Sequence, residues 1–155
     1  MDLTDLISPD AVFDGLKARS KKQVLQELAD AAAKGVGLTS RDIFDVLLQR
    51  ERLGSTGIGQ GVAIPHGKLK GLDRIYGYFA HLKTPIDFDA VDDEPVDTIF
   101  LLLAPEGAGA DHLKALARIS RLLRDGATLH KLRNAHDAAA LYAILTEPAS
   151  SSHAA

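Results

Sequence analysis

A run of five apolar residues, Ile99-Phe-Leu-Leu-Leu103, restricts the possible folds of this chain more than any other feature of its sequence. A strand with one face in water alternates apolar and polar residues, whereas a run that is apolar at every position is typical of a strand buried on both faces. We therefore predict a central strand over Val96–Ala104. Three further strands are predicted, at Ala11–Ala18, Val62–Ile64 and Arg74–Leu82.

Helices are predicted both before and after these strands. Ser20 and Gln23 have the spacing of a capping box, and apolar residues follow at helical spacing until Gly35 and Gly37. The other predicted helices run from the N-cap pair Thr39-Ser40 to about Leu53, start near Asp111, and cover Thr128–Arg133 and Asp137–Leu145. Helices on both sides of a series of strands predict an α/β sandwich.

The length of 155 residues predicts one domain, since domains average roughly 150 residues. Such a chain buries enough surface to fold around one core without disulfides, and it contains no cysteine. We predict that residues 1–147 form the domain. Residues 148–155 offer nothing to bury and are expected to form a flexible tail.

Charge and hydropathy exclude several classes of function. The net charge is −3 and no stretch collects the basic residues, so binding to nucleic acid is not expected. The N-terminus carries acidic residues where a secretory signal needs basic ones, and no apolar run approaches the roughly 20 residues that span a bilayer. We therefore expect a cytoplasmic protein that does not insert into a membrane.

Glycines are concentrated in one segment: five of the 13 fall within the fourteen residues Gly54–Gly67. Because glycine is unfavourable in regular structure, this density indicates either a ligand-binding loop or a plain connection between a helix and a strand. Gly61 and Gly67-Lys68 have the wrong spacing for a Walker A loop. The order of helix first and strand second is opposite to that of a Rossmann turn.

His66 follows the apolar segment Val62–Pro65, and Pro65 is expected to end that strand. The imidazole would then lie at a strand end beside the glycines, and its ordinary pKa of about 6.5 leaves one ring nitrogen unprotonated near neutral pH. Because the chain has no cysteine and no serine in a nucleophile elbow, His66 is the best candidate nucleophile. A purely structural role for this histidine remains open.

The segment around His66 carries a longer pattern. The nineteen residues Arg50–Lys68, which include Ile58-Gly59 and Val62-Ala-Ile-Pro-His-Gly67, resemble the active-site signature of the enzyme IIA components of the sugar phosphotransferase system, in the fructose/mannitol and nitrogen-regulatory family. The resemblance extends through Thr84–Asp89 and Asp111–Leu116 to nearly the whole chain. It implies the mannitol-type enzyme IIA fold, a three-layer α/β/α sandwich with a small mixed sheet.

The resemblance also implies a phosphohistidine carrier that needs no cofactor. His66 would accept a phosphoryl group from a small phosphocarrier protein, HPr or its nitrogen-branch counterpart. The second histidine of the family corresponds to His112, and Asp111 before it suits the N-cap of a helix whose N-terminus favours anions. Arg50 corresponds to the arginine of the family, with Arg52 as the alternative, and a guanidinium suits phosphoryl oxygens. Surface roles remain open for His112 and both arginines.

A set of loop residues is expected to bind the phosphoryl group: Ser55, Thr56, Gly59, Gln60 and Gly67. The hydroxyls of the first two have an equally good role in a turn. Mannitol-type relatives tend to carry Glu at the position of Gln60, and the loss of a negative charge near the phosphate favours the nitrogen-regulatory branch, whose partners would be regulatory target proteins. The alternative is a sugar-uptake enzyme IIA that passes phosphate to a IIB component, and a second alternative is a non-catalytic binding scaffold.

No metal site is predicted. The six carboxylates between Asp87 and Asp97 lack the residue order and central glycine of an EF-hand, so we expect a solvated turn there. The remaining histidines lack the spacing of zinc ligands: His81, His130, His136 and His153.

Overall fold

The computed structural model describes residues 2–148. Within them a mixed six-stranded sheet has the order β1-β5-β6-β3-β2, and β4 also pairs with β6. The strands are β1 (Val12–Leu16), β2 (Gly57–Gly59), β3 (Val62–Ala63), β4 (His66–Leu69), β5 (Tyr76–Ile86) and β6 (Val96–Pro105). β1 is parallel to β5 and both β3 and β4 are parallel to β6, whereas β5 and β2 run antiparallel to their partners β6 and β3. Apart from Pro148, the predicted tail lies outside the described residues, and so does His153.

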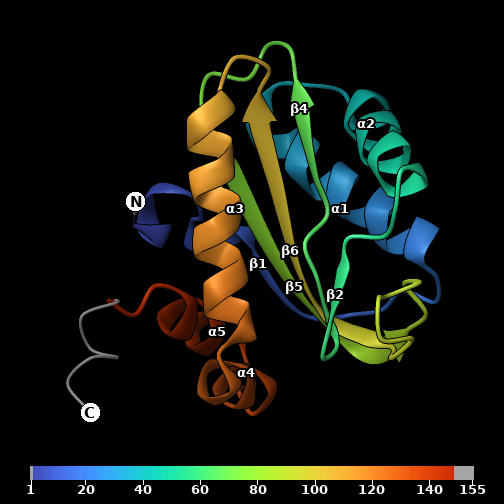
Figure 1. Ribbon diagram of the computed structural model, residues 1–155. Coiled ribbons are helices and arrows are strands. Elements are labelled where there is room, and N and C mark those ends of the chain that lie inside the picture. The colour runs from blue at the N-terminus through green and yellow to red at the C-terminus, as the bar shows by residue number, and fades with distance from the viewer. Residues whose placement is uncertain (1, 149–155) are drawn as a thin grey trace.

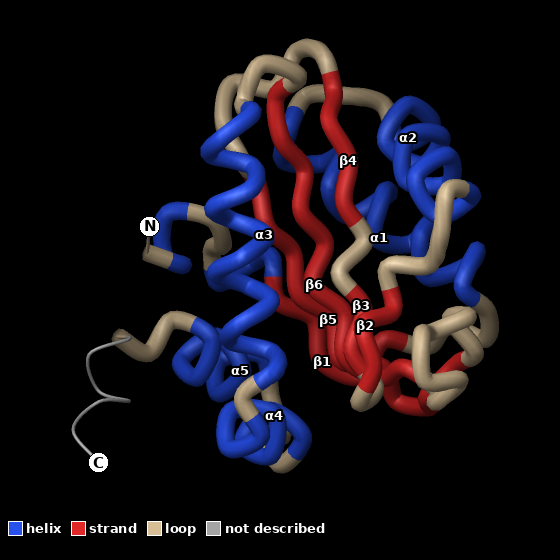
Figure 2. The backbone as a smooth tube through the Cα atoms, viewed as in Figure 1, coloured by secondary structure: helices blue, strands red, loops and turns tan. Residues whose placement is uncertain are grey.

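Helices cover both faces of the sheet (Figures 1 and 2). α1 (Lys21–Val36) and α2 (Ser40–Arg52) lie on one face, and α3 (Gly109–Arg124) lies across the other, with α4 (Gly126–Arg133) and α5 (Ala138–Leu145) below it. Two short 3-10 helices, Leu3–Asp5 and Pro9–Ala11, precede β1. Within residues 2–148 no helix is both long and apolar enough to cross a membrane. The predicted three-layer α/β/α sandwich with a mixed sheet is confirmed.

Side chains cap α1 much as the sequence predicts. The Ser20 hydroxyl accepts a hydrogen bond from the backbone N–H of Gln23 at 3.1 Å. The Gln23 side chain accepts one from the N–H of Arg19 at 2.8 Å, one residue before the position that a capping box would use. Gly37 then ends the helix with a left-handed φ of 74°, which glycine adopts without steric cost.

The start of α3 differs from the prediction. Ala108 is the N-cap, no side chain caps the helix, and Asp111 lies inside the first turn. A backbone turn performs this function instead, because the N–H of Ala108 donates to the carbonyl of Pro105 at 3.0 Å and that of Asp111 donates to Ala108 at 2.9 Å. The prediction that Asp111 caps this helix is therefore wrong.

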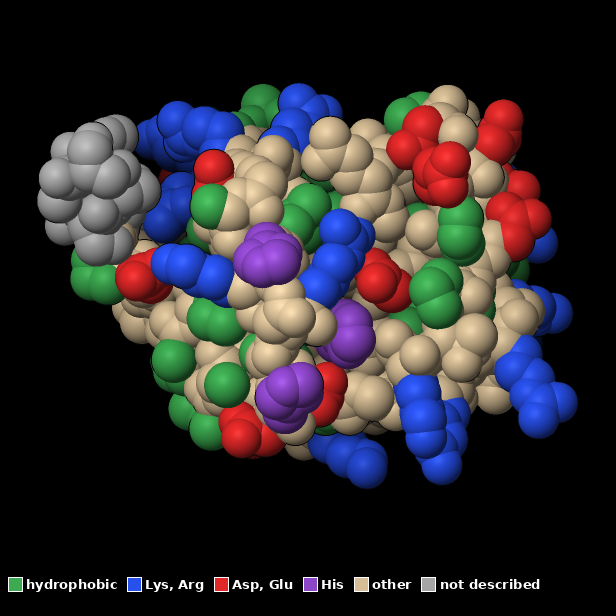
Figure 3. Space-filling model, turned by 90° about the horizontal axis from the view of Figure 1, so that it is seen from below, with side chains coloured by type: hydrophobic (Ala, Val, Ile, Leu, Met, Phe, Trp, Pro, Cys, Tyr) green, Lys and Arg blue, Asp and Glu red, His purple; other side chains and the backbone are tan. Residues whose placement is uncertain are grey.

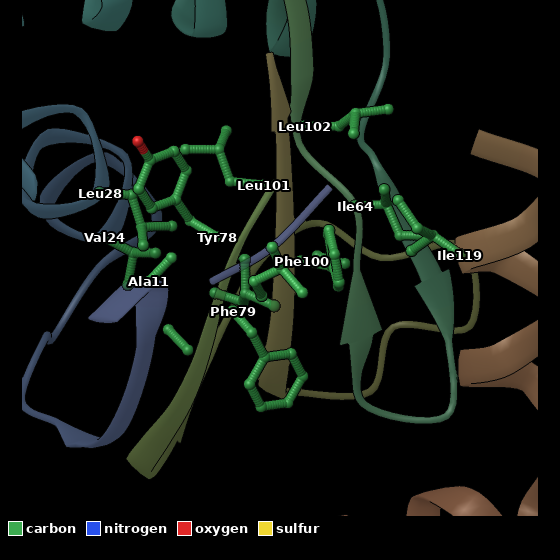
Figure 4. Close-up of a cluster of buried hydrophobic side chains, with 14 of the residues drawn as sticks. Ala11, Val24, Leu28, Ile64, Tyr78, Phe79, Phe100, Leu101, Leu102 and Ile119 are labelled. Atoms are coloured by element: carbon green, nitrogen blue, oxygen red, sulfur yellow. The ribbon is translucent and has the colours of Figure 1, made fainter. Parts of the chain in front are cut away.

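β6 forms the centre of the core, since each of residues 99–104 is 0% exposed. Its side chains alternate between the two helix layers: Leu101 lies towards Leu28 of α1, and Leu102 lies towards Ile119 of α3 (Figure 4). Phe100 packs edge to face on Phe79 of β5, with ring centroids 6.4 Å apart. The prediction of a central strand buried on both faces is confirmed.

β3 and β4 follow the same edge of β6 and are separated only by Ile64 and Pro65. Proline has no N–H to donate, but the Pro65 carbonyl accepts a hydrogen bond from Leu102 at 3.0 Å, so pairing continues across the break. β3 ends before Pro65, as predicted, but the expectation that His66 lies at the end of that strand is wrong, because His66 begins β4 and lies opposite Leu102 within the sheet.

Candidate functional site

The ring of His66 is held in one orientation by the strand break that precedes it. Its Nδ1 lies 2.9 Å from the carbonyl oxygen of Ile64. Because a carbonyl only accepts, Nδ1 carries the proton, and the neutral ring then presents the lone pair of Nε2. The contact with Ile64 fixes the ring. Because the side chain is only half-buried, Nε2 remains available to a reactant.

Arg50 donates to this free nitrogen. Its Nε lies 3.3 Å from Nε2 of His66, and its Nη1 donates to the carbonyl of Gly54 at 2.8 Å. The second bond fixes the guanidinium beside the imidazole, where its planar array of donors can bind an anion. Arg52 is exposed at the end of α2. Of the two arginines left open by the sequence, the structure therefore brings Arg50 to His66.

His112 approaches from α3, on the other face of the sheet from α2. The rings of His66 and His112 meet edge to face, with centroids 5.6 Å apart and an interplanar angle of 72°. His112 is only 5% exposed, and its Nε2 has no hydrogen-bond partner among the described residues. A buried polar atom without a partner is costly, so the position of this nitrogen indicates a group that arrives during function.

Both imidazoles favour the neutral form. Burial lowers the pKa of His66, the bond to Ile64 opposes this change, and the positive charge of Arg50 lowers the pKa further. Burial also lowers the pKa of His112, with smaller contributions in the same direction from the charges of His66 and Lys68. Since ordinary histidine titrates near 6.5, a lowered pKa leaves His66 neutral at physiological pH.

Gly67 allows α2 to pack closely against β4. A Cβ added at Gly67 would lie 2.5 Å from Cγ1 of Val46, a separation that real Cβ atoms do not adopt. Val46 is one turn before Arg50 on α2, so the close approach brings the guanidinium within reach of His66. Gly67, predicted to bind the phosphoryl group, is thus found in a packing contact that sets the geometry of the site.

The hydroxyls of Ser55 and Thr56 are both used within the loop. Ser55 donates to the carbonyl of Phe88 at 2.7 Å, and Thr56 donates to the carboxylate of Glu51. The backbone N–H of Thr56 also donates to Glu51, at 3.0 Å. These contacts agree with the role in a turn that the sequence left open for the two hydroxyls.

Glu51 is a site residue whose role the sequence analysis missed. It is only 8% exposed, and Lys21 of α1 pairs with its carboxylate at 3.0 Å. It thereby connects α1 to the loop that begins at Gly54. A signal was present, because Glu51 continues the four-residue spacing of the buried Ile43 and Leu47 in α2.

Gly59 and Gln60 lie elsewhere. They form the turn between β2 and β3, with φ values of 103° and 57°, and the N–H of Gln60 donates to Asp92 at 2.9 Å. The Gln60 carbonyl accepts a hydrogen bond from Arg133 of α4. The structure thus joins this turn to Asp92 and Arg133 rather than to His66. The presence of Gln instead of Glu at position 60 therefore no longer favours the nitrogen-regulatory branch, because that argument required Gln60 to lie beside the phosphoryl group.

Apolar side chains are exposed on the segments that form the site. Leu53 (85% exposed) ends α2 next to Gly54, and Leu113 (70% exposed) follows His112. Val91 (76% exposed) belongs to the loop that is hydrogen-bonded to Gly57. Large exposed apolar side chains are typical of a surface that contacts another protein.

The site has the composition needed for covalent catalysis without a metal. It presents a neutral nucleophilic nitrogen, a fixed guanidinium and a buried nitrogen without a partner. Within residues 2–148 no group of three or more His, Cys, Asp or Glu side chains is arranged to hold a metal ion. An imidazole nitrogen beside hydrogen-bond donors, as at His66, Arg50 and His112, can in chemical terms accept an anionic group.

Comparisons with known proteins agree on one family. Residues 5–147 match the family model described as phosphoenolpyruvate-dependent sugar phosphotransferase system, EIIA 2. The chain is 60% identical over 148 residues to the nitrogen regulatory protein of Bradyrhizobium diazoefficiens, covering 96% of this chain and 97% of that protein. It is also similar to the crystal structure of the nitrogen regulatory protein IIA-Ntr from Neisseria meningitidis, with a TM-score of 0.89, 35% identity, and coverage of 93% of this chain and 99% of that one. The mannitol IIA of Escherichia coli shares the fold, with a TM-score of 0.75, 19% identity, and coverage of 89% and 97%.

Proposed function

The chain belongs to the EIIA 2 family of the phosphoenolpyruvate-dependent sugar phosphotransferase system, and we propose that it carries a phosphoryl group on Nε2 of His66. The observation that carries this proposal is the pair of contacts on the ring. Nδ1 donates to the Ile64 carbonyl at 2.9 Å, and Nε2 accepts from Arg50 at 3.3 Å and from no other donor among residues 2–148. The nucleophilic nitrogen is therefore defined before a donor arrives.

The transfer step needs no proton movement at His66. The lone pair of Nε2 attacks the phosphorus of a phosphorylated carrier protein, an N–P bond forms, and the bond from phosphorus to the donor breaks with its electrons returning to the donor. The ring becomes more positive, and the Nδ1–H bond to Ile64 stabilises that charge. Arg50 neutralises the phosphoryl oxygens, and Nε2–H of His112 supplies a further donor to them.

We propose a small phosphocarrier protein, HPr or its nitrogen-branch counterpart, as the donor, with the exchange in the cytoplasm. The exposed side chains of Leu53, Val91 and Leu113 support a protein rather than a free phosphate compound as the reactant, since an apolar surface of this kind is desolvated by a partner of similar size. The phosphorylation state of His66 would then govern binding to regulatory target proteins in nitrogen or potassium metabolism. This role is supported by the similarity to nitrogen regulatory proteins.

The experiment is mass spectrometry after mixing the protein with a phosphorylated HPr-type donor. We expect an acid-labile gain of one phosphate, absent in His66→Ala and retained in His136→Ala, which changes an exposed histidine outside the site. Labelling of the His66→Ala variant would refute the assignment of the acceptor. If neither HPr nor its nitrogen-branch counterpart labels the wild-type protein, the result would favour a non-catalytic scaffold.

Sugar uptake is the second candidate function, because the family model describes a sugar system. The two roles differ in what receives the phosphate. A sugar-uptake enzyme IIA must pass the group to a IIB component, whereas a regulatory protein binds its target differently in its two states. Transfer of the label from phosphorylated His66 to a IIB protein encoded in the same organism would establish the uptake role.

A further inference from the structure

A second cleft lies at the end of the sheet where β1 and β5 finish and α1 begins. It has a volume of about 570 Å³, within the range of roughly 300–1,000 Å³ that is typical of small-molecule sites. Two segments form it: residues 17–19 with Gln23, and residues 83–87. None of the residues assigned to the phosphoryl site lines it.

Positive charge dominates this cleft although the chain as a whole is acidic. Lys17, Arg19 and Lys83 line it together with a single acidic residue, Asp87, in a protein of net charge −3. Among residues 2–148 none of these three cations forms an ion pair. Figure 3, which views this end of the molecule, shows Lys and Arg side chains at several places on this face and a group of Asp and Glu side chains at one corner.

Asp87 offsets only part of this charge, because three cations and one carboxylate leave a net charge of +2 on the lining, and within residues 2–148 Asp87 forms no ion pair with any of them. Asp87 accepts a hydrogen bond from the N–H of Asp89 at 2.9 Å, which uses its carboxylate in a local turn. Three unpaired cations that line one hollow repel one another and concentrate anions there. The cleft therefore favours a ligand that carries at least two negative charges.

The remaining wall of the cleft is apolar or neutral. Ala18 and Ile86 are buried, and Pro85 and Thr84 are exposed beside them. A ligand that filled the cleft would place an organic part against Ala18, Pro85 and Ile86 while its charged group contacted the cations. Arginine and lysine both bind phosphate well, arginine through two parallel donors.

We propose that this cleft is a binding site for a small organic phosphomonoester. The dianionic phosphate lies among Lys17, Arg19 and Lys83, and the organic part packs against the apolar wall. Binding is noncovalent and involves no transfer of the phosphate. The proposal is independent of phosphoryl transfer at His66, so His66→Ala must bind the same ligand with unchanged affinity.

The test is an NMR titration of the full chain with three probes: AMP, adenosine and inorganic phosphate. We expect AMP to cause saturable shifts of the amides of residues 17–23 and 83–87, with weaker binding at high salt. Inorganic phosphate binds more weakly than AMP, and adenosine causes no saturable shift. Loss of one charged contact in Lys83→Ala or Lys17→Ala weakens AMP binding by about tenfold. Lys70→Ala, which removes an exposed cation outside the cleft, leaves it unchanged.

Three results would overturn the proposal. The first is the absence of saturable shifts at the cleft with AMP, and the second is equal affinity for AMP and inorganic phosphate, which would remove the role of the apolar wall. The third is equal AMP affinity in the Lys83→Ala and Lys70→Ala proteins. Both variants change exposed side chains, and the spectra themselves report whether each variant is folded.

Discussion

The carboxylate of Glu51 offers a direct test of how the site is held together. It accepts hydrogen bonds from the hydroxyl of Thr56 and from its N–H at 3.0 Å, and Lys21 Nζ lies 3.0 Å away. In Glu51→Gln the side chain keeps its shape and loses its charge. With the NH2 group in the place of Oε2, it donates to the Thr56 hydroxyl oxygen and the Thr56 O–H loses its acceptor; in the place of Oε1, it faces the N–H of Thr56 and the ammonium of Lys21. At least one of these donors is left without an acceptor.

The magnitude follows from burial. A buried donor without an acceptor costs about 1–3 kcal/mol, and breaking a fully buried ion pair costs roughly 3–5 kcal/mol. Since the Lys21 side chain is 19% exposed, water solvates part of its charge, and we expect a loss of about 2–3 kcal/mol in the free energy of unfolding. At about 2–4 °C per kcal/mol for a domain of this size, the Tm falls by roughly 4–12 °C.

Glu51→Gln should also affect His66 and the guanidinium beside it. The loop held by Glu51 includes Gly54, whose carbonyl accepts the 2.8 Å bond from Arg50, so a looser loop misplaces the guanidinium and slows phosphoryl acceptance. Burial lowers the pKa of His66 and the negative charge of Glu51 partly offsets that effect. Glu51→Gln therefore lowers the pKa of His66 further, a change that a purely structural defect far from the site would not produce.

Thermal unfolding, transfer from the labelled donor and NMR titration of His66 measure the three effects of Glu51→Gln. Glu106→Gln is the matched control, because Glu106 is exposed and lies outside the loop. A Tm, a transfer rate and a His66 pKa equal to those of the control would show that the Thr56 loop is ordered without the carboxylate. That result would refute the reasoning.

Three further predictions concern the histidines and the packing of α2. His112→Ala should still accept phosphate, but about 10²–10³-fold more slowly in radiolabelled transfer, because one donor to the phosphoryl oxygens is lost. Gly67→Ala, whose Cβ would lie 2.5 Å from Val46, should cost about 1–3 kcal/mol in urea unfolding, and adding Val46→Ala should restore part of the loss. Because the pKa values of His66 and His112 lie below the ordinary 6.5, the unfolded chain binds protons first as pH falls, so stability is present above about pH 6.5 and is lost below it. Urea unfolding at about pH 7.5 and about pH 5.5 should show a smaller loss when both histidines are Ala.

Local sequence patterns predicted most of the fold. The Ile99–Leu103 run identified the central strand because burial on both faces leaves an unmistakable composition. Helical spacing could also have distinguished Arg50 from Arg52 as the arginine beside His66. Arg50 is three residues after the buried Leu47 and therefore lies near the packed face of α2. Such signals depend only on residues close in the sequence.

The parts that were missed depend on contacts between distant residues. β4 exists because His66–Leu69 pairs with the far end of β6, and nothing in four residues after a proline indicates that partner. The family resemblance pointed to His112, whose ring meets that of His66 in the structure, but the physical reason offered for it failed. Asp111 does not cap α3, and what positions His112 is the packing of the helix against the sheet, which leaves its Nε2 buried beside His66.

The exposed apolar side chains explain how one phosphoryl group could select between protein partners. Leu53, Val91 and Leu113 are exposed and carry no charge, so we expect their contribution to binding to be the same for the unmodified protein and for the phosphorylated form that we propose. The phosphorylation of His66 that we propose would add about two negative charges at pH 7 to the site. A partner with acidic contacts there is repelled by up to several kcal/mol, whereas one with a basic rim is favoured. The electrostatic difference alone then decides the choice of partner. His66→Glu, which supplies one negative charge, should shift that choice in the same direction as phosphorylation but by a smaller factor.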